Sequence, residues 1–221
     1  MDWMQYLKER QDVLSTAKQM VNHNLVSGTW GNVSVRVKGE AAMVITPSGL
    51  AYSALGLKDM VVVGWDGAIV EGDHKPSIET QMHMQIYNRF SHINAIVHVH
   101  SPYATAFAVA GKRIPMVIEE AAQVIGHDIK VAPYAPCGTR ELARNTVSTL
   151  TDGDRAVLLS NHGLVGLGET VEDALKVCDV AERTAMIAIF SAVLGSTNCL
   201  TPDQVNIVKR DYQHYGPEKE G

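Results

Sequence analysis

Aromatic side chains are scarce in this sequence, and it carries no excess of basic residues. Only 6% of its 221 residues are aromatic, and the formal net charge at pH 7 is −5. Single-stranded nucleic acids bind to aromatic stacking platforms, and phosphate backbones and acidic membranes attract positively charged surfaces. We therefore expect no nucleic-acid partner and no membrane partner, which leaves a small-molecule substrate.

Long apolar runs and paired cysteines are also lacking. The N-terminus has neither the basic start nor the apolar core of a signal peptide, and the most apolar stretch, residues 185–194, is too short to cross a bilayer. The three cysteines, Cys137, Cys178 and Cys199, are odd in number and follow no metal-binding spacing. Unpaired thiols are typical of reducing compartments, so we expect a cytoplasmic protein.

The length and apolar content fit one globular domain. A chain of 221 residues with 46% hydrophobic residues can build a substantial core. No linker, repeat or low-complexity tract divides it. We expect a single domain over residues 1–221, in which the polar residues from about 212 to 221 form a flexible tail.

Apolar periodicity predicts a mixture of helices and strands. Helical spacing predicts helices over about 2–26, 78–89, 102–110 and 139–150, and a long one from Thr170. Alternating or β-branched runs predict strands at 33–37, 43–45, 61–65, 68–70, 96–99, 129–131 and 156–159. The dipeptide Asp66-Gly67 predicts a hairpin, so part of the sheet should be antiparallel.

The run from Ala95 to Pro102 contains two histidines on a predicted strand. Alternate side chains of a strand share a face, so His98 and His100 point the same way and can bind one metal ion. An isolated pair of this kind is more often exposed or hydrogen-bonded than metal-binding. Glu79 and His162 favour a metal site, because three imidazoles and a carboxylate form a zinc-type set with one removable ligand.

Other polar positions have ordinary alternatives. Loops around residues 28–34 and 46–49 offer backbone amides and hydroxyls to an anion, although glycine and serine also form plain turns. Neither loop has the spacing of a nucleotide-binding motif. Glu79 also fits a carboxylate at a helix N-terminus, and Glu119-Glu120 fits the exposed start of a helix.

The motifs together resemble the class II aldolase/epimerase/adducin-head family, in particular enzymes similar to L-fuculose-phosphate aldolase. The resemblance covers about residues 5–195. It rests on Gly28-x-x-Gly31-Asn32-Val33-Ser34, Ile45-Thr46-Pro47-Ser48-Gly49, Lys75-Pro76-Ser77-x-Glu79, His98-x-His100-Ser101, Ala132-Pro133-Tyr134, Gly138-Thr139-x-Glu141-Leu142 and His162-Gly163.

This resemblance implies a three-layer α/β/α fold around a central, mostly antiparallel mixed sheet. It implies a homotetramer with sites at subunit interfaces. Zinc, or Mn²⁺, Co²⁺ or another divalent metal, would be held by His98, His100, His162 and Glu79. The positions that match the family's substrate-binding residues are Gly28, Asn32, Thr46, Ser48, Gly49 and Ser77.

The implied activity is that of a lyase of carbohydrate metabolism. It would cleave a carbon–carbon bond of a small hydroxy-ketone, sugar or sugar phosphate through a metal-bound enediolate, with Glu79 as the acid/base. Glutamate at position 79, where the family's epimerases carry aspartate, favours aldolase-like cleavage. A decarboxylase or dehydratase on the same metal site is the alternative, and a non-catalytic adducin-head-like interaction module is the alternative from another class.

Two positions depart from the fuculose-type pattern. Ile78 stands where those aldolases have a second phosphate-binding serine, which favours a non-phosphorylated or weakly held phosphorylated substrate. Their proton-donating tyrosine from the neighbouring subunit falls at about Glu119, and a related dehydratase branch uses a nearby glutamate. We therefore expect Glu119 or Glu120 to be a second acid/base that reaches a neighbour's metal.

Overall fold

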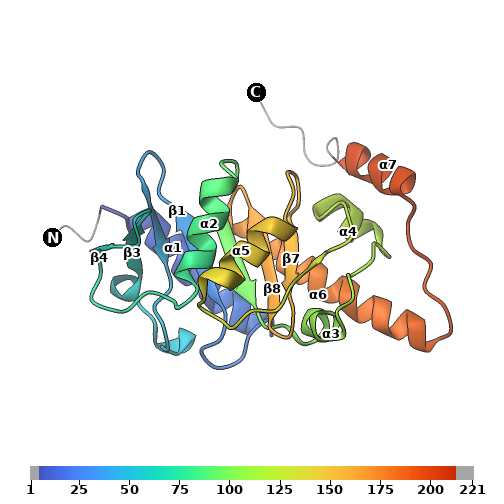
Figure 1. The fold of residues 1–221 in the computed structure, drawn as a ribbon, viewed down its shortest axis with the longest axis horizontal. Helices are drawn as coiled ribbons and strands as arrows, with labels where there is room; N and C mark the ends of the chain where they lie inside the picture. The colour runs from blue at the N-terminus through green and yellow to red at the C-terminus, as the bar shows by residue number, and fades with distance from the viewer. Residues whose placement is uncertain (1–4, 213–221) are drawn as a thin grey trace.

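The computed structural model describes residues 5–212, which form an eight-stranded sheet between layers of helices (Figure 1). The strand order is β4-β3-β2-β1-β5-β8-β7-β6. Every neighbouring pair is antiparallel except β6 and β7, which run parallel. The predicted three-layer α/β/α fold with a mostly antiparallel mixed sheet is confirmed.

The strands are short, and their bounds follow the predicted apolar runs closely. They are β1 Asn32–Arg36, β2 Ala42–Ile45, β3 Val61–Gly64, β4 Ile69–Glu71, β5 Ala95–Val99, β6 Val131–Ala132, β7 Ala156–Leu159 and β8 Gly163–Gly168. The predicted hairpin at Asp66-Gly67 joins β3 to β4. Strand β8 is an addition, because no strand is predicted after His162.

The helices cover both faces of the sheet and one end of it. They are α1 Leu7–Asn22, α2 Thr80–Arg89, α3 Pro102–Ala110, α4 Glu119–Val124, α5 Arg140–Thr149, α6 Val171–Val193 and α7 Pro202–Tyr212, with short 3-10 turns η1 Tyr52–Ala54 and η2 Leu57–Asp59. In Figure 1, α2 and α5 lie in front of the sheet, and α4 and α7 lie together at the right-hand end.

Alternate strand residues supply two separate cores. Val97 on β5 belongs to the core shared with α1, α3 and α6. Its neighbour Ile96 belongs to the core shared with α2 and α5. His98 therefore faces the α2 and α5 side, because it is two residues from Ile96 on the same strand.

Glycines in β8 let α6 lie close to the sheet. A Cβ atom at Gly166 would lie 2.6 Å from Cys178 Sγ and 2.7 Å from the Ala174 carbonyl oxygen. No larger residue fits at this position unless the helix moves outward. The close contact fixes β8, which neighbours β5 in the sheet, against the longest helix.

Several predicted boundaries differ from the structure. The first helix begins at Leu7 and ends at Asn22, because Asn24 adopts a left-handed φ of 58° that ends the helical turn. Residues 1–4 lie outside the described part, as does the expected tail apart from Tyr212, which closes α7. Within residues 5–212, no helix combines the length and apolarity needed to span a membrane.

Candidate functional site

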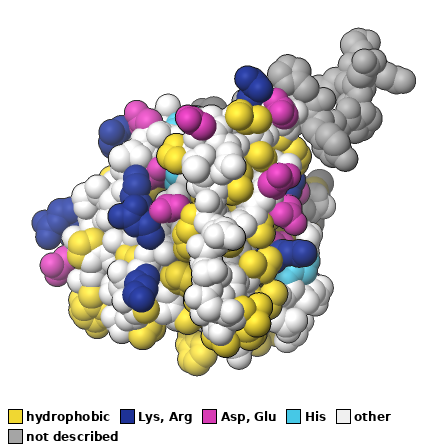
Figure 2. Space-filling model, turned by 90° about the vertical axis from the view of Figure 1, so that its right-hand side faces the viewer, with side chains coloured by type: hydrophobic (Ala, Val, Ile, Leu, Met, Phe, Trp, Pro, Cys, Tyr) yellow, Lys and Arg dark blue, Asp and Glu magenta, His cyan; other side chains and the backbone are white. Residues whose placement is uncertain are grey.

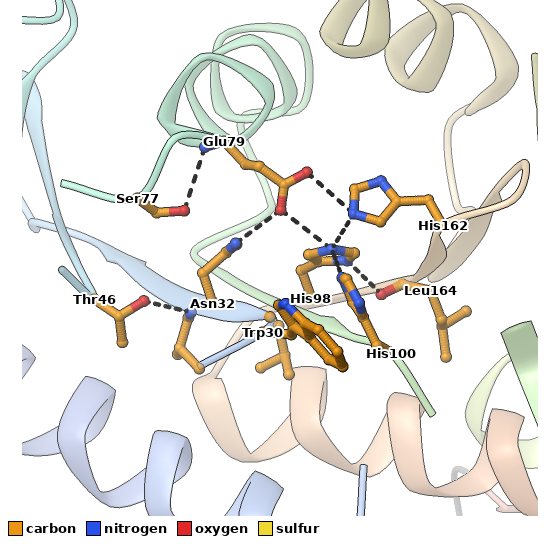
Figure 3. Close-up of polar contacts among 12 residues, drawn as sticks. Trp30, Asn32, Thr46, Ser77, Glu79, His98, His100, His162 and Leu164 are labelled. Atoms are coloured by element: carbon orange, nitrogen blue, oxygen red, sulfur yellow. Dashed lines mark hydrogen bonds and ion pairs between the residues drawn. The ribbon is translucent and has the colours of Figure 1, made fainter. Parts of the chain in front are cut away.

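Three imidazoles from in or beside the neighbouring strands β5 and β8 meet on the side of the sheet that faces α2 and α5. His98 lies in β5, His100 follows that strand directly, and His162 precedes β8. The Nε2 atom of His98 lies 3.0 Å from that of His100 and 3.3 Å from that of His162. Figure 3 shows the three rings pointing toward one another. The prediction that His98 and His100 share a face is confirmed.

The turn before β8 places His162 beside β5. Asn161 has a left-handed φ of 57°, and a Cβ atom at Gly163 would lie 2.3 Å from the Val99 carbonyl oxygen. The chain therefore turns sharply and passes in direct contact with the end of β5. His98 Nδ1 donates to the Leu164 carbonyl oxygen over 2.9 Å, which leaves the lone pair of Nε2 directed at the other two rings.

Glu79 completes the cluster from the start of α2. Its side chain is only 4% exposed, and it makes no capping hydrogen bond to the helix. Oε2 lies 3.2 Å from His98 Nε2, and Oε1 lies 3.6 Å from His162 Nε2. Asn32 Nδ2 donates to Oε2 over 2.9 Å. The carboxylate thus faces the histidines instead of serving as a plain helix cap.

The histidines are neutral at ordinary pH, which is the form that binds metals. Burial lowers the pKa of His98 to about 4, and burial together with the neighbouring imidazoles lowers that of His162 to about 4 and that of His100 to about 3. At these separations the lone pair of His98 Nε2 must face either an N–H of a neighbouring ring or a cation. Glu79 Oε1 is also buried without a hydrogen-bond partner.

These observations fit a divalent metal. The three imidazole nitrogens form a group within 4.8 Å of one another, and a carboxylate with an unused oxygen stands beside them. Imidazole and carboxylate ligands together suit zinc and several other divalent ions. The four predicted metal ligands are therefore all brought together.

A cavity of about 230 Å³ opens over this cluster, and His100, His162 and Glu79 are in its wall. The predicted substrate-binding residues that line it are Asn32, Ser48, Gly49 and Ser77. Two do not line it. Thr46 is 1% exposed and its hydroxyl accepts a hydrogen bond from the Val33 N–H, and Gly28 forms a left-handed turn just before the cavity.

Trp30 lines the cavity, although no motif or periodicity in the sequence singles it out. Its ring is 61% exposed and is stacked on His100 at a centroid distance of 6.2 Å and an angle of 16°. The backbone beneath it is fixed, because Tyr52 donates its hydroxyl to the Gly31 and Trp30 carbonyl oxygens. Its place beside Gly31-Asn32 in the sequence was the available signal.

Ile78 and Cys137 also line the cavity. Ile78 is 59% exposed, so it lies at the mouth of the site and not in a core. Cys137 is an exposed free thiol next to Gly138, whose Cβ would lie 3.1 Å from the Ile78 carbonyl oxygen. The loop before α5 therefore packs directly on the loop before α2.

Glu119 and Glu120 do not line this cavity. They form the first turn of α4, and Glu119 lines a separate cavity against α7. The alternative that this pair starts a helix is correct as far as local structure goes. A role in catalysis therefore requires a second subunit.

Comparison with known proteins identifies relatives that align over nearly the whole chain. Residues 11–189 match the family described as class II aldolase and adducin N-terminal domain. A 5-deoxy-D-ribulose 1-phosphate aldolase of Bacillus thuringiensis is 35% identical over 96% of this chain and 98% of its own. A 5-methylthioribulose-1-phosphate/5-deoxyribulose-1-phosphate aldolase of Rhodospirillum rubrum is 32% identical over 94% and 92%.

A solved structure of an L-fuculose 1-phosphate aldolase has the same fold. Its TM-score is 0.91 at 32% identity, and the match covers 96% of this chain and 100% of the other. The prediction of a metal-dependent carbon–carbon lyase of the aldolase kind is confirmed by these relatives. The chain belongs to the class II aldolase and adducin N-terminal domain family.

Proposed function

We propose that this protein is a zinc-dependent aldolase that cleaves a ketose 1-phosphate into dihydroxyacetone phosphate and a small aldehyde. The observation that carries the proposal is the meeting of three imidazole nitrogens and the Glu79 carboxylate beside one cavity, whose wall includes His100, His162 and Glu79. The aldolases named above act on short ketose phosphates, of which 5-deoxy-D-ribulose 1-phosphate is the first candidate.

His98, His100 and His162 would hold the metal, and Glu79 would be the removable fourth ligand. A bound divalent cation supplies Lewis-acid stabilisation of the negative charge that develops on the substrate's ketone oxygen. Neutral imidazoles leave the cation its full charge for this purpose. Mn²⁺ and Co²⁺ are the alternatives to zinc.

Cleavage needs two proton transfers, and this chain's cavity offers Glu79 for one of them. One base removes the proton from the hydroxyl group beyond the breaking bond, and the electron pair of that bond moves to the ketone side as the aldehyde leaves. Glu79, which takes up a proton from solvent when substrate displaces it, then gives that proton to the carbon that has lost its partner, and the base returns its own proton to solvent. Asn32 fixes the Glu79 carboxylate through the 2.9 Å hydrogen bond, which keeps the proton donor in one orientation.

The hydroxyls of Ser48 and Ser77 are the principal side-chain donors for the phosphate group. The N–H groups of these two serines already donate to the carbonyl oxygens of Lys75 and Thr46. Among the described residues, no lysine or arginine lines the cavity. Neutral donors alone would therefore hold the phosphate, and Ile78 adds none. Ile78 by itself favours a non-phosphorylated substrate. The relatives are named as aldolases of ketose phosphates, and on this ground we propose a phosphorylated ketose as the substrate.

We also propose a cytoplasmic homotetramer with active sites at subunit interfaces. Figure 2 shows hydrophobic side chains spread over the end of the molecule that faces right in Figure 1. Helices α3 and α6 form an apolar groove of about 380 Å³ lined by residues such as Phe107 and Ile189, and Val193 and Leu194 beyond it are 78% and 89% exposed. A second copy covering this surface would bury these side chains.

The second acid/base would come from a neighbouring subunit in that assembly. Glu119 and Glu120 are the candidates, because they lie in α4 at the same end of the molecule and outside their own chain's cavity. Light scattering that finds a fully active monomer would rule this arrangement out.

A cleavage assay tests the proposal. Purified protein loaded with Zn²⁺ is incubated with 5-deoxy-D-ribulose 1-phosphate, D-ribulose 1-phosphate and L-fuculose 1-phosphate, and dihydroxyacetone phosphate is measured. We expect cleavage of at least one ketose, loss of activity after chelation and recovery with Zn²⁺. Carbon dioxide or a dehydrated ketone without dihydroxyacetone phosphate would favour the decarboxylase or dehydratase alternative.

A further inference from the structure

A second polar pair, Ser34 and His83, joins β1 to α2 next to the pair formed by Asn32 and Glu79. Ser34 Oγ lies 2.6 Å from His83 Nδ1, and both side chains are 0% exposed. Neither residue lines the cavity, so neither touches a substrate held there. Buried polar side chains lower stability unless they are fully paired, so this pair calls for an explanation other than core packing.

The two pairs repeat one another along the two elements. Ser34 follows Asn32 by two residues, so both side chains lie on the same face of β1 at a spacing of about 6.6 Å. His83 follows Glu79 by four residues, a rise of about 6 Å or slightly more than one helical turn. The two spacings nearly match, and the pairs Asn32–Glu79 and Ser34–His83 therefore form successive cross-links between the strand and the helix.

The Ser34–His83 cross-link has more hydrogen bonds around it than the Asn32–Glu79 cross-link. Tyr87, one turn further along α2, places its hydroxyl 2.8 Å from Ser34 Oγ and 3.0 Å from the Ser34 carbonyl oxygen. Burial keeps His83 neutral, since it lowers the pKa of this residue to about 3. His83 can therefore accept a hydrogen bond at Nδ1 from the Ser34 hydroxyl. The Tyr87 hydroxyl holds Ser34 in place, because it donates to the Ser34 carbonyl oxygen.

The His83 imidazole also lowers the stability of the fold in a way that an apolar side chain would not. His83 Nε2 is buried without a hydrogen-bond partner among the described residues. An apolar side chain of similar size would fill the same space with no unsatisfied atom. The polar contact therefore serves the placement of β1 against α2 more than it serves stability.

We propose that Ser34 and His83 are positioning residues that set the orientation of the Glu79 carboxylate. Their contact fixes the distance between β1 and α2 next to the site. Because Asn32 and Glu79 lie on the same two elements, their separation depends on that distance. The inference rests on the proposed role of Glu79 as the acid/base. A small shift of α2 along β1 would move the carboxylate relative to His98 and His162 while leaving those two residues in place, because they lie on β5 and before β8.

The variant Ser34→Ala removes the cross-link while leaving the cavity wall intact. A displacement of a catalytic group by about 1 Å can lower the rate about 100-fold. Loss of this one cross-link should displace the Glu79 carboxylate by less, so we expect kcat for ketose phosphate cleavage to fall about 10-fold. KM and the zinc content per chain should not change. Thr146→Val is the matched control, because it removes a buried hydroxyl in the same helical layer that donates to the Leu142 carbonyl oxygen of its own helix, α5. It should change kcat by no more than about twofold.

A double-mutant cycle separates positioning from a general loss of structure. Glu79→Gln abolishes proton transfer, so Ser34→Ala should have no further effect on the residual rate of Glu79→Gln. If Ser34→Ala does not fold, His83→Gln replaces it. Glutamine retains a hydrogen-bond acceptor for Ser34, so this variant should be more active than His83→Leu, which has none.

Three results would overturn the inference. These are an unchanged kcat in Ser34→Ala, an equal loss in Thr146→Val, or rate losses that multiply in the Ser34→Ala/Glu79→Gln protein. Full activity of Glu79→Gln would instead remove the proposed role of Glu79 itself, and the inference with it. An inactive Glu79→Gln beside a fully active Ser34→Ala leaves the proposed function standing and refutes only the positioning role.

Discussion

Asn32 donates a hydrogen bond of 2.9 Å to the carboxylate of Glu79, which lies 47 residues further along the chain. The family resemblance suggests that Asn32 contacts the substrate, and the residue does line the cavity. Its Nδ2 atom, however, is already engaged with Glu79, while its Oδ1 atom is buried without a partner. Asn32 is thus placed to orient the proposed acid/base as well as to meet a ligand.

The first prediction separates these two roles of Asn32. If holding Glu79 is the main role, Asn32→Ala lowers kcat by about 10-fold or more and changes KM little. If phosphate binding is the main role, KM rises instead. Steady-state kinetics with 5-deoxy-D-ribulose 1-phosphate distinguish the two. We expect the effect on kcat to be larger, and a change confined to KM would contradict us.

The second prediction concerns two glycines that both adopt left-handed backbone conformations. A Cβ at Gly31 would lie 2.5 Å from the His98 carbonyl oxygen, whereas nothing lies within 4 Å of a Cβ at Gly28. Gly28→Ala should therefore lower the free energy of unfolding by about 1 kcal/mol from backbone strain alone. Gly31→Ala should cost about 3 kcal/mol or more and displace β1 from β5.

Urea unfolding of the two glycine variants provides the measurement. The matched pair isolates the close contact with β5, since both substitutions introduce the same methyl group at a positive φ. Equal losses in the two proteins would show that this contact does not constrain the site.

The third prediction concerns the missing phosphate donor at position 78. Ile78 is 59% exposed, so Ile78→Ser should change stability little. A new hydrogen bond to a charged phosphate is worth about 1.5–3 kcal/mol, so KM for a phosphorylated ketose should fall about 10-fold or more. Ile78→Ala is the control, because it shortens the side chain without adding a hydroxyl. The same KM in both variants would mean that position 78 does not face the phosphate.

The fourth prediction concerns pH and the stability of the metal-free protein. Burial lowers the pKa of His83 from 6.5 to about 3. Below pH 6.5 the unfolded chain binds a proton at this residue that the folded chain does not bind. Stability therefore falls as the pH drops from 6.5 toward 4, by up to about 1.4 kcal/mol per pH unit from His83 alone.

The variant His83→Gln tests this assignment. Urea unfolding at several pH values between 7 and 4.5, with a chelator present, should give a shallower pH dependence in the variant by about one proton. The other buried histidines contribute equally to both proteins and cancel in the comparison. Identical slopes would show that His83 is protonated in the folded state.

The positions of three of the four proposed metal ligands could be predicted from the sequence because they follow local rules. Strand alternation alone places His98 and His100 on one side, and their Nε2 atoms are indeed 3.0 Å apart. The helix that follows Pro76 brings Glu79 near a helix start, where the structure has it. His162 needed more than local reasoning, since its position depends on a left-handed turn at Asn161.

Other features could not be predicted, for identifiable physical reasons. Strand β8 contains three glycines, which are depleted in strands, yet Gly166 is required because α6 packs against it. Helix α7 buries only Val205 and becomes stable through its contact with α4. The stacking of Trp30 on His100 depends on the tertiary placement of a loop, to which no periodicity in the sequence corresponds.

The most direct test of the account follows hydrogen exchange in dihydroxyacetone phosphate. Removal of a proton from its hydroxymethyl carbon is the half-reaction that precedes aldol addition, and it requires both the metal and Glu79 but no aldehyde. In D₂O, NMR should show that the zinc-loaded protein exchanges one hydrogen of that carbon and that the metal-free protein does not. Glu79→Gln should retain zinc and exchange at least about 100-fold more slowly. Absence of exchange with the zinc-loaded protein, or an unchanged rate in Glu79→Gln, would contradict the account.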